Sequence, residues 1–297
     1  MKLNIGYFAD GPWSHRTFDK LINDTEIKVS FICVRFGSND KILKNYAKHY
    51  GIDYLEEKNV NSKAFVHSLK KYNCDLFVSM SFNQIFKNEI INLTKFKIIN
   101  CHAGKLPFYR GRNVLNWVLI NDEKEFGITV HYIDEGIDTG DIILQRNYEI
   151  SDLDNYKTLL EKAYVECANI LYDAILMFKK NQVKSQKQIE LHPQGFYCTQ
   201  RKKGDEILNF NQKSREIFNF VRAICSPGPN ARVYLNKKEM KIIKVELIKE
   251  APIYKCSVGV ILQKGINYFL VKTKDSFIKV TDFEYDGEIK IGDRFEI

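Results

Sequence analysis

Several patterns that would assign the chain to a common class are missing from this sequence. Its seven cysteines form no CxxC pair, and their odd number argues against a complete disulfide framework. Thiols scattered in this way favour a reducing, cytoplasmic environment. No uninterrupted apolar run reaches roughly 18 residues, so we expect no membrane span. Residues 1–6 are typical of a first strand and not of a signal peptide.

The sequence also lacks the signatures of dinucleotide and nucleic-acid binding. Gly6 and Gly11, in and after the first expected strand, do not form GxGxxG, which sets aside a nicotinamide enzyme. The formal net charge is +8, but no basic run is long enough to act as a nucleic-acid-binding arm. This charge fits a phosphate-bearing partner and equally a surface that lysines keep in solution.

What is present indicates a mixed α/β fold. The 297 residues, 44% of them hydrophobic, are enough for a substantial core and for two domains. Apolar runs alternate with segments of helical periodicity, which predicts a Rossmann-like, doubly wound, mostly parallel sheet. We expect Ser14 to cap the first helix, Asn39 to cap the helix that Gly51 closes, and Phe96–Asn100 to be the central strand. The expected strands are residues 3–8, 26–34, 53–55, 75–80, 96–100 and 127–133, and later helices are 39–50, 61–73, 87–93 and 152–179.

The chain changes character around Arg201–Asp205, where basic and turn-forming residues precede a run of short strands. From Ala231 onward, apolar and polar residues alternate, with hairpin turns expected at residues 236–238 and 263–265. This pattern predicts a small, OB-like β-barrel. The sequence therefore predicts a first domain over residues 1–204 and a second domain over residues 205–297.

Polar side chains follow two of the expected strands. The strand that begins at Phe96 delivers Asn100 and His102, which project to the same side because they are two residues apart in extended chain. The strand at residues 127–133 runs into a glycine-rich loop that contains Asp138. Since ligands of open α/β sheets bind beyond the strand ends, this amide, imidazole and carboxylate predict a functional site.

Three separated motifs occur in order around this predicted site. They are Asn100-Cys101-His102, Leu106-Pro107-Phe108-Tyr109-Arg110-Gly111 and Asp138-Thr139-Gly140-Asp141. Together they resemble the signature of the folate-dependent formyltransferases, and a weaker resemblance extends over most of the chain. The resemblance implies formyl transfer to an amine, with 10-formyltetrahydrofolate as the donor and with no metal.

The same resemblance assigns a catalytic role to three side chains. Asn100 would donate an N–H to the carbonyl oxygen that becomes negative when an amine attacks the formyl carbon. His102 would move a proton, since the usual pKa of histidine, about 6.5, lies near neutrality. Asp138 would orient the ring and favour its charged form. Each motif alone is also typical of an ordinary strand end or turn, and it is their ordered occurrence that favours catalysis.

Further positions are assigned to ligands by the resemblance. The loop Ser81, Phe82, Asn83 and Gln84 corresponds to the segment that holds the pterin ring of the folate, largely through backbone groups, and Asp134 and Gly136 correspond to the other wall. Substrate contacts are expected from residues near the first strand and from the second motif. Trp13 fits equally well as a residue that packs over the sheet. These expected contacts are Trp13, His15, Tyr109, Arg110, Arg112 and Asn113.

The sequence leaves open which class of amine receives the formyl group. A purine-pathway enzyme would need only the first domain. A methionyl-tRNA formyltransferase would account for two domains and positive charge, but enzymes of that group carry an inserted basic loop after the second strand, where this chain has only residues 35–39. The segments at 109–117 and 131–132 look most like the N-formyltransferases of nucleotide-linked amino sugars.

Within that class the resemblance favours a UDP-linked 4-amino-4,6-dideoxy sugar for surface glycans, of the pseudaminic acid type. Such an enzyme would bind the nucleotide-linked amino sugar and the folate, and neither nucleic acid nor membrane. Enzymes of this class are often homodimers, and the second domain could supply an interface. The two alternatives are a methionyl-tRNA formyltransferase and an inactive, ligand-binding relative.

Overall fold

The structure is a computed structural model that describes residues 2–296. It contains two compact units, and each is described by itself. The first unit comprises the chain up to Gly111 together with Phe126–Tyr148 and Glu161–Cys198. The second comprises Arg112–Glu125, Glu149–Leu160 and the chain from Thr199 onward. The second unit thus takes in two earlier stretches besides the C-terminal part, and the domain boundary after residue 204 stays a prediction.

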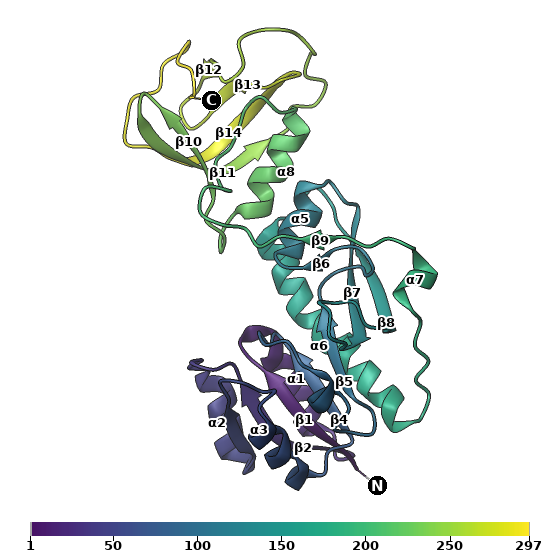
Figure 1. Cartoon of the computed structure of the whole chain (residues 1–297). Helices are drawn as coiled ribbons and strands as arrows, with labels where there is room; N and C mark the ends of the chain where they lie inside the picture. Colours follow the sequence, from purple (N-terminus) through teal and green to yellow (C-terminus); the bar gives the residue numbers. More distant parts are fainter. Residues whose placement is uncertain (1, 297) are drawn as a thin grey trace. The chain divides into compact units, whose positions relative to one another are not determined.

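A seven-stranded sheet forms the centre of the first unit (Figure 1). Its strands are β1 (Leu3–Ala9), β2 (Ile27–Val34), β3 (Asp53–Glu56), β4 (Leu76–Met80), β5 (Ile98–His102), β7 (Glu125–Tyr132) and β8 (Ile142–Glu149), in the order β3-β2-β1-β4-β5-β7-β8. The pairs from β3 to β5 are parallel, whereas β7 runs antiparallel to β5. The mixed α/β class and the mostly parallel sheet are therefore confirmed.

The strand that carries the predicted catalytic residues begins later than expected. The sequence predicted residues 96–100, but β5 spans Ile98–His102, and Phe96 and Lys97 belong to the preceding turn, in which Lys97 has φ +62°. The middle strand of the sheet is β4, with β5 beside it. As a result, His102 is itself part of the ladder, paired with Thr129 of β7, and both predicted catalytic side chains are held on regular strand geometry.

Helices cover both faces of the sheet. One face meets α1 (Pro12–Asn23), α2 (Lys41–Tyr50) and α6 (Tyr156–Lys179), through contacts such as Tyr7 with Phe18 and Tyr132 with Phe178. The other face meets α3 (Lys63–Leu69) and α4 (Asn88–Ile91) around a cluster that includes Phe8 and Phe77. Because neighbouring strand residues point to opposite faces, Tyr7 packs against one layer of helices and Phe8 against the other.

The helix starts follow local chemistry, with two corrections to the sequence prediction. Ser14 does not cap α1, because Gly11 with φ +68° is the cap residue and Pro12 opens the helix, a position where proline costs no hydrogen bond. The Ser14 hydroxyl instead donates to the Gly11 carbonyl at 2.8 Å. Asp40 and not Asn39 caps α2, with Oδ1 accepting from two backbone N–H groups, and Gly51 ends α2 in the left-handed conformation as predicted.

The second unit contains an antiparallel five-stranded sheet with the order β10-β11-β14-β13-β12. Its elements are α5 (Val114–Ile120), α8 (Ser214–Ile224), β10 (Ala231–Leu235), β11 (Lys238–Glu246), β12 (Ile261–Lys264), β13 (Phe269–Lys272) and β14 (Phe277–Glu284). The predicted turn between β10 and β11 has positive φ at Asn236 and Lys237, which is the type I′ geometry that suits a two-residue hairpin. The C-terminal segment donates from Glu296 N to Tyr234 O and from Phe295 N to Gly259 O, so it links the two edges of the sheet.

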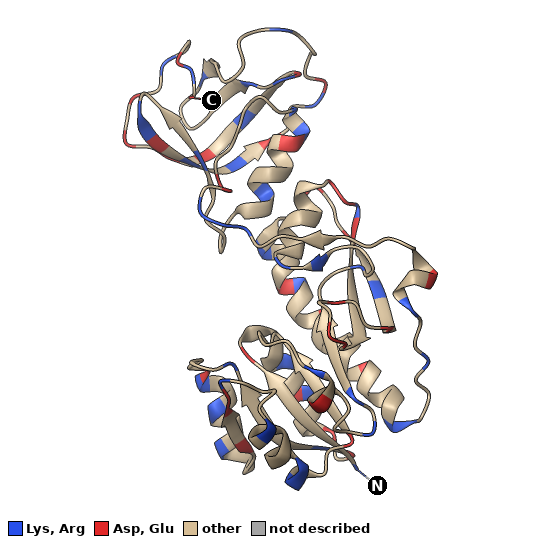
Figure 2. Cartoon of the chain, viewed as in Figure 1, with Lys and Arg blue, Asp and Glu red and all other residues tan. Residues whose placement is uncertain are grey.

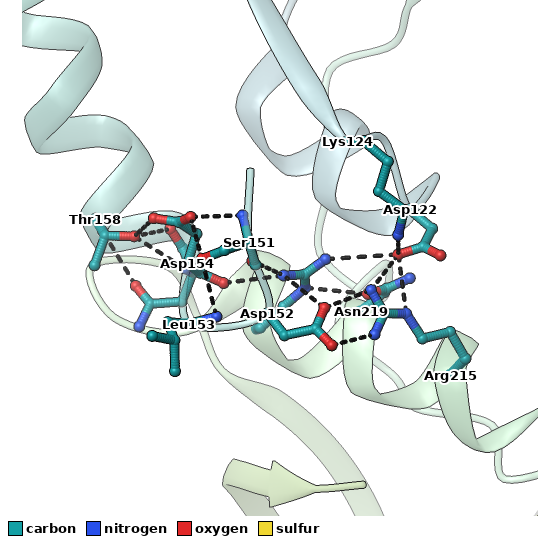
Figure 3. A network of polar contacts seen from close by, with 11 residues as sticks. Asp122, Lys124, Ser151, Asp152, Leu153, Asp154, Thr158, Arg215 and Asn219 are labelled. Carbon is teal, nitrogen blue, oxygen red and sulfur yellow. Dashed lines mark hydrogen bonds and ion pairs between the residues drawn. The ribbon is translucent and has the colours of Figure 1, made fainter. Parts of the chain in front are cut away.

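An ionic network holds the two earlier stretches of the second unit on α8 (Figure 3). Arg215 donates to Asp152 through two nitrogens at 2.7 and 2.6 Å, and to Asp122 Oδ1 at 2.9 and 2.5 Å. Arg222 donates to the Ser151 carbonyl at 2.7 Å. Elsewhere, basic and acidic residues are scattered along the ribbon of both units (Figure 2). Over residues 2–296, no helix combines the length and the apolar character needed to cross a bilayer.

Candidate active site

Two of the three predicted catalytic residues lie close together in the first unit. The Nδ1 atom of His102 is 3.5 Å from Oδ2 of Asp138, which lies on the loop between β7 and β8. The other ring nitrogen, Nε2, is 2.7 Å from the backbone oxygen of Tyr109. Because a carbonyl oxygen only accepts, Nε2 carries a proton and donates it. The nitrogen that can gain or lose a proton is therefore Nδ1, which faces the carboxylate.

The Asp138 carboxylate is buried and charged. Its side chain is 12% exposed, and Oδ2 accepts a hydrogen bond from the backbone N–H of Gly111 at 2.9 Å. Burial acts to raise the pKa of Asp138, but the charge of His102 and the Gly111 N–H outweigh it and hold this pKa well below its usual range. A negative charge thus lies beside Nδ1 of His102.

Asn100 is paired with a histidine that the sequence prediction did not assign to the site. It lies directly opposite His131 in the β5–β7 register, and its Nδ2 atom is 3.3 Å from Nε2 of that ring. The same Nε2 is 3.5 Å from Oδ1 of Asp138. The four side chains therefore form one chain of contacts, from Asn100 through His131 and Asp138 to His102.

Two glycines are required by this close packing. A Cβ at Gly104 would lie 2.4 Å from Nε2 of His102 and 2.5 Å from the Tyr109 oxygen, which is the very contact that orients the ring. A Cβ at Gly140 would lie 1.9 Å from the backbone oxygen of Tyr132. All three distances are far below van der Waals contact, so any side chain at these positions would displace the His102 ring or the Asp138 loop.

Gln188, on the short helix α7 (Gln188–Leu191), also supports the site and was missed by the sequence analysis. Its side chain is 5% exposed. Its Nε2 donates to the backbone oxygens of Asp138 and Gly140, both at 2.8 Å, and its Oε1 accepts from Arg110 at 2.6 and 3.1 Å. A polar residue in a polar, extended stretch carries no local signal, so only the folded chain shows this role.

The chain that follows Gln188 pairs with the second sequence motif. Arg110–Gly111 form β6, which pairs in parallel with β9 (Tyr197–Cys198). The neighbouring backbone groups of β6, the Tyr109 carbonyl and the Gly111 N–H, face His102 and Asp138. Beside Arg110 and Gln188 lies an open pocket of about 350 Å³, which Lys187 and His192 also line. The backbone around this strand thus forms one wall beside His102 and Asp138.

The predicted folate loop is ordered by internal contacts. Ser81 has φ +58°, and its backbone and side-chain oxygens accept from Arg35 at 2.7 and 2.8 Å. Phe82 packs edge-on against Phe8 at 5.5 Å. The Gln84 side chain accepts from Val60 N and donates to Glu57 O, while Asn83 is exposed. Asp134 accepts from Gly136 N and from the Thr139 hydroxyl.

The predicted substrate residues are divided between the two units. In the first, His15 bonds Asp40 at 2.8 Å, Trp13 packs against Tyr164 at 4.6 Å, Tyr109 is buried, and Arg110 contacts Gln188 as described. Arg112 and Asn113 lie in the second unit, where they bond Gln200 and the backbone of Arg201. Among the described residues there is no group of three or more His, Cys, Asp or Glu side chains arranged to hold a metal ion.

Comparison with known proteins assigns the family. The family model described as formyl transferase matches residues 23–175. The family model for the formyl transferase C-terminal domain matches residues 201–292. The chain belongs to the formyl transferase family. It is therefore an enzyme of formyl group transfer, as the resemblance implied. The matched segments contain the described side chains of Asn100, His102, His131 and Asp138.

Relatives of known sequence and known structure differ in their acceptors. The methionyl-tRNA formyltransferase of Thermodesulfovibrio yellowstonii is 33% identical over 248 residues, which cover 83% of this chain and 77% of the relative. That of Halothermothrix orenii is 29% identical and covers 99% and 96%. The N-formyltransferase of Helicobacter canadensis, solved with folinic acid and dTDP-3-aminofucose, superimposes with a TM-score of 0.68 at 25% identity and covers 96% and 100%. WlaRD, a sugar 3N-formyltransferase solved with dTDP and 5-N-formyl-THF, has a TM-score of 0.70 at 24% identity, covers 95% and 98%, and bears on the fold alone.

Proposed function

We propose that this enzyme transfers the formyl group of 10-formyltetrahydrofolate to the amine of a nucleotide-linked amino sugar. The observation that carries the proposal is the end-to-end match, through both units, with the Helicobacter canadensis N-formyltransferase, which was solved with a folate and an amino-sugar nucleotide. The contacts among Asn100, His131, Asp138 and His102 add a set of groups suited to acyl transfer.

The residues of the predicted folate site fit a flat heterocycle. Phe82 offers an apolar ring that Phe8 and Phe86 hold in place. The side chains of Ser81 and Gln84 are engaged within the protein, so hydrogen bonds to a pterin would come from the backbone of this loop. Asp134 and Gly136 would form the opposite wall. When bound, the folate supplies an electrophilic formyl carbon.

The chemistry then depends on the three catalytic residues. As the amine nitrogen bonds to the formyl carbon, Asn100 donates an N–H to the carbonyl oxygen, which becomes negative. His102 accepts through Nδ1 the proton that the amine loses and returns a proton to the nitrogen of the leaving group. Asp138 stabilises the imidazolium that exists between these two transfers.

The acceptor is proposed to be a UDP-linked 4-amino-4,6-dideoxy sugar, on the basis of the sequence segments at 109–117 and 131–132. The neighbour from Helicobacter canadensis carries a dTDP-linked 3-amino sugar, so both nucleotides and both amine positions belong in the test. The pocket beside Arg110 and Lys187 supplies positive charge within the first unit, which suits the diphosphate that either nucleotide would bring.

Methionyl-tRNA is the second candidate acceptor, because the similar proteins of known sequence carry that activity in their names. The connection between β2 and α2 supports the sugar instead. It spans only residues 35–40, and its groups are used within the protein: Gly37 N donates to Glu56, the Ser38 hydroxyl to Asp10, and Asp40 caps α2. This compact turn stands where the resemblance implies a basic loop for tRNA.

The test is an assay with 10-formyltetrahydrofolate and a panel of acceptors: UDP- and dTDP-linked 3- and 4-amino sugars and initiator methionyl-tRNA. We expect tetrahydrofolate release together with a formyl mass on one of the sugars. Formylation of the tRNA alone, with affinity that falls steeply as salt rises, would replace the sugar by the second candidate. The absence of any turnover with all acceptors would favour an inactive, ligand-binding relative.

A further inference from the structure

His131 is the buried titratable group of the site that the chemistry above leaves without a role. It lies on β7, opposite Asn100 of β5, and is 2% exposed. One of its ring nitrogens faces both Asn100 and Asp138, at 3.3 and 3.5 Å. A histidine buried between two catalytic groups, and in contact with both, can control how each of them is presented.

The backbone determines which nitrogen of His131 carries the proton. Its Nδ1 atom is 2.7 Å from the carbonyl oxygen of Tyr132. A carbonyl oxygen can only accept, so Nδ1 must donate. In the neutral ring, Nε2 then has a lone pair and is an acceptor. It can accept from the Asn100 amide, whereas neither oxygen of Asp138 can donate to it while that carboxylate is charged.

This arrangement selects one of two orientations for the Asn100 amide. An asparagine can present either its oxygen or its NH₂ group to a neighbour. With an acceptor at His131 Nε2, the NH₂ group must face the ring, since an oxygen there would meet a lone pair. One N–H of Asn100 then bonds His131, and the second N–H remains for the carbonyl oxygen of the formyl group.

We propose that His131 is a positioning residue for formyl transfer, whose neutral ring fixes the Asn100 amide so that an N–H and not an oxygen meets the developing negative charge. The proposal rests on the role given to Asn100 in the proposed function. Its effect on the rate passes through Asn100. The His131 ring also contacts Asp138, the carboxylate beside His102. His131 therefore lies between Asn100 and the Asp138–His102 pair.

The test is a double-mutant cycle with His131→Leu and Asn100→Ala. Leucine has a side chain of similar size but lacks the acceptor. The loss of one oriented hydrogen bond predicts a several-fold fall in kcat, up to roughly 10-fold. KM for the folate and for the acceptor should change less than about twofold, since binding is not affected. In the Asn100→Ala background, His131→Leu should cost almost nothing more, because the group that it orients is already gone.

A conservative variant keeps the proposal testable if leucine disturbs folding. His131→Gln retains an amide oxygen that can accept from Asn100, and it should recover most of the lost kcat. Multiplicative effects in the cycle, or wild-type turnover in His131→Leu, would overturn the proposal. The cycle is measured with whichever amine the enzyme formylates, so an error in the sugar assignment leaves it intact. If Asn100→Ala alone keeps normal turnover, then the role of Asn100, on which this proposal rests, is wrong.

Discussion

Two polar networks, one in each unit, each place aspartate carboxylates beside nitrogen-bearing side chains. They differ in the lengths of these contacts. In the second unit, Arg215 lies within 2.5–2.9 Å of Asp122 and Asp152, so that its guanidinium makes four direct hydrogen bonds. In the first unit, Asp138 lies 3.5 Å from His102 and from His131. The carboxylate of Asp138 is 12% exposed, and that of Asp122 is 36% exposed.

Under the proposed mechanism, the difference separates a network that holds structure from one that takes part in the reaction. Short bonds to arginine, a group that stays charged, leave no proton to move. The site around Asp138 combines burial, which is costly, with contacts that are long and with rings that can change charge. Groups whose hydrogen bonds are long still have donors and acceptors available for a proton transfer or for an oxyanion. Substitutions in the two networks should therefore affect different quantities.

The largest effect is expected from removal of the proton-transferring ring. His102→Ala should lower turnover by roughly 100- to 10,000-fold, the usual worth of general acid–base catalysis. The fold should persist, because the ring's hydrogen bond is to a backbone oxygen, that of Tyr109, and its other nitrogen faces Asp138. Steady-state turnover and thermal unfolding measure both effects, with the exposed His67→Ala as control. Near-normal turnover in a folded His102→Ala protein would disprove the proposed mechanism.

A smaller loss is expected when Asp138 keeps its shape and loses its charge. Asp138→Asn should slow turnover by up to roughly 100-fold, since His102 can still accept a proton but its charged form has lost its counter-charge. The acidic limb of the rate profile should move to lower pH for the same reason. Profiles of kcat against pH for wild type, Asp138→Asn and the neighbouring Glu135→Gln would show it. An unchanged acidic limb would mean that Asp138 does not act on the titrating group.

Gln188 connects structure and rate. Gln188→Leu leaves two backbone oxygens of the Asp138 loop and the Arg110 guanidinium without this partner. We expect the free energy of unfolding to fall by about 2 kcal/mol, and turnover to fall roughly tenfold because Asp138 is less well placed. Denaturant unfolding and kcat test the two effects, and Gln182→Leu on the surface is the control. A change in stability without any change in kcat would limit Gln188 to a structural role.

The smallest effect is expected in the second unit and only on stability. Burial acts to raise the pKa of Asp122, but hydrogen bonds from Arg215, Lys124 and Asn219 lower it to about 2. A carboxyl with a depressed pKa stabilises the fold above its unfolded pKa of about 3.9, and this contribution is lost as pH falls through about 2. Its size is about 1 kcal/mol or less, because the pair is partly exposed.

Asp122→Asn should therefore be slightly less stable than wild type at pH 7, and the difference should shrink between about pH 4 and pH 2. Unfolding curves at several pH values, with the exposed Asp282→Asn as the control, measure this change. Turnover at pH 7 should remain that of the wild type. A large loss of turnover in Asp122→Asn would contradict the division of roles between the two networks.

Much of the fold follows from local patterns in the sequence. The alternation of apolar runs and helical periodicity predicted the parallel sheet, Gly51 as the end of a helix, and the hairpin turn at residues 236–237. These features depend on neighbours in the chain. The errors at Ser14 and at the start of β5 are also local, since Pro12 and the turn before Ile98 competed successfully with the expected signals.

The sequence by itself determined which chemical groups are present and in what order: Asn100 and His102 two residues apart on one strand, and Asp138 on a loop beyond another. Only the tertiary structure decided their partners. Register places His131 opposite Asn100, because β7 runs antiparallel to β5. The fold also brings Gln188 to the Asp138 loop over a separation of 50 residues in the chain. Contacts between segments so far apart arise from packing and hydrogen-bond satisfaction, which no local pattern encodes.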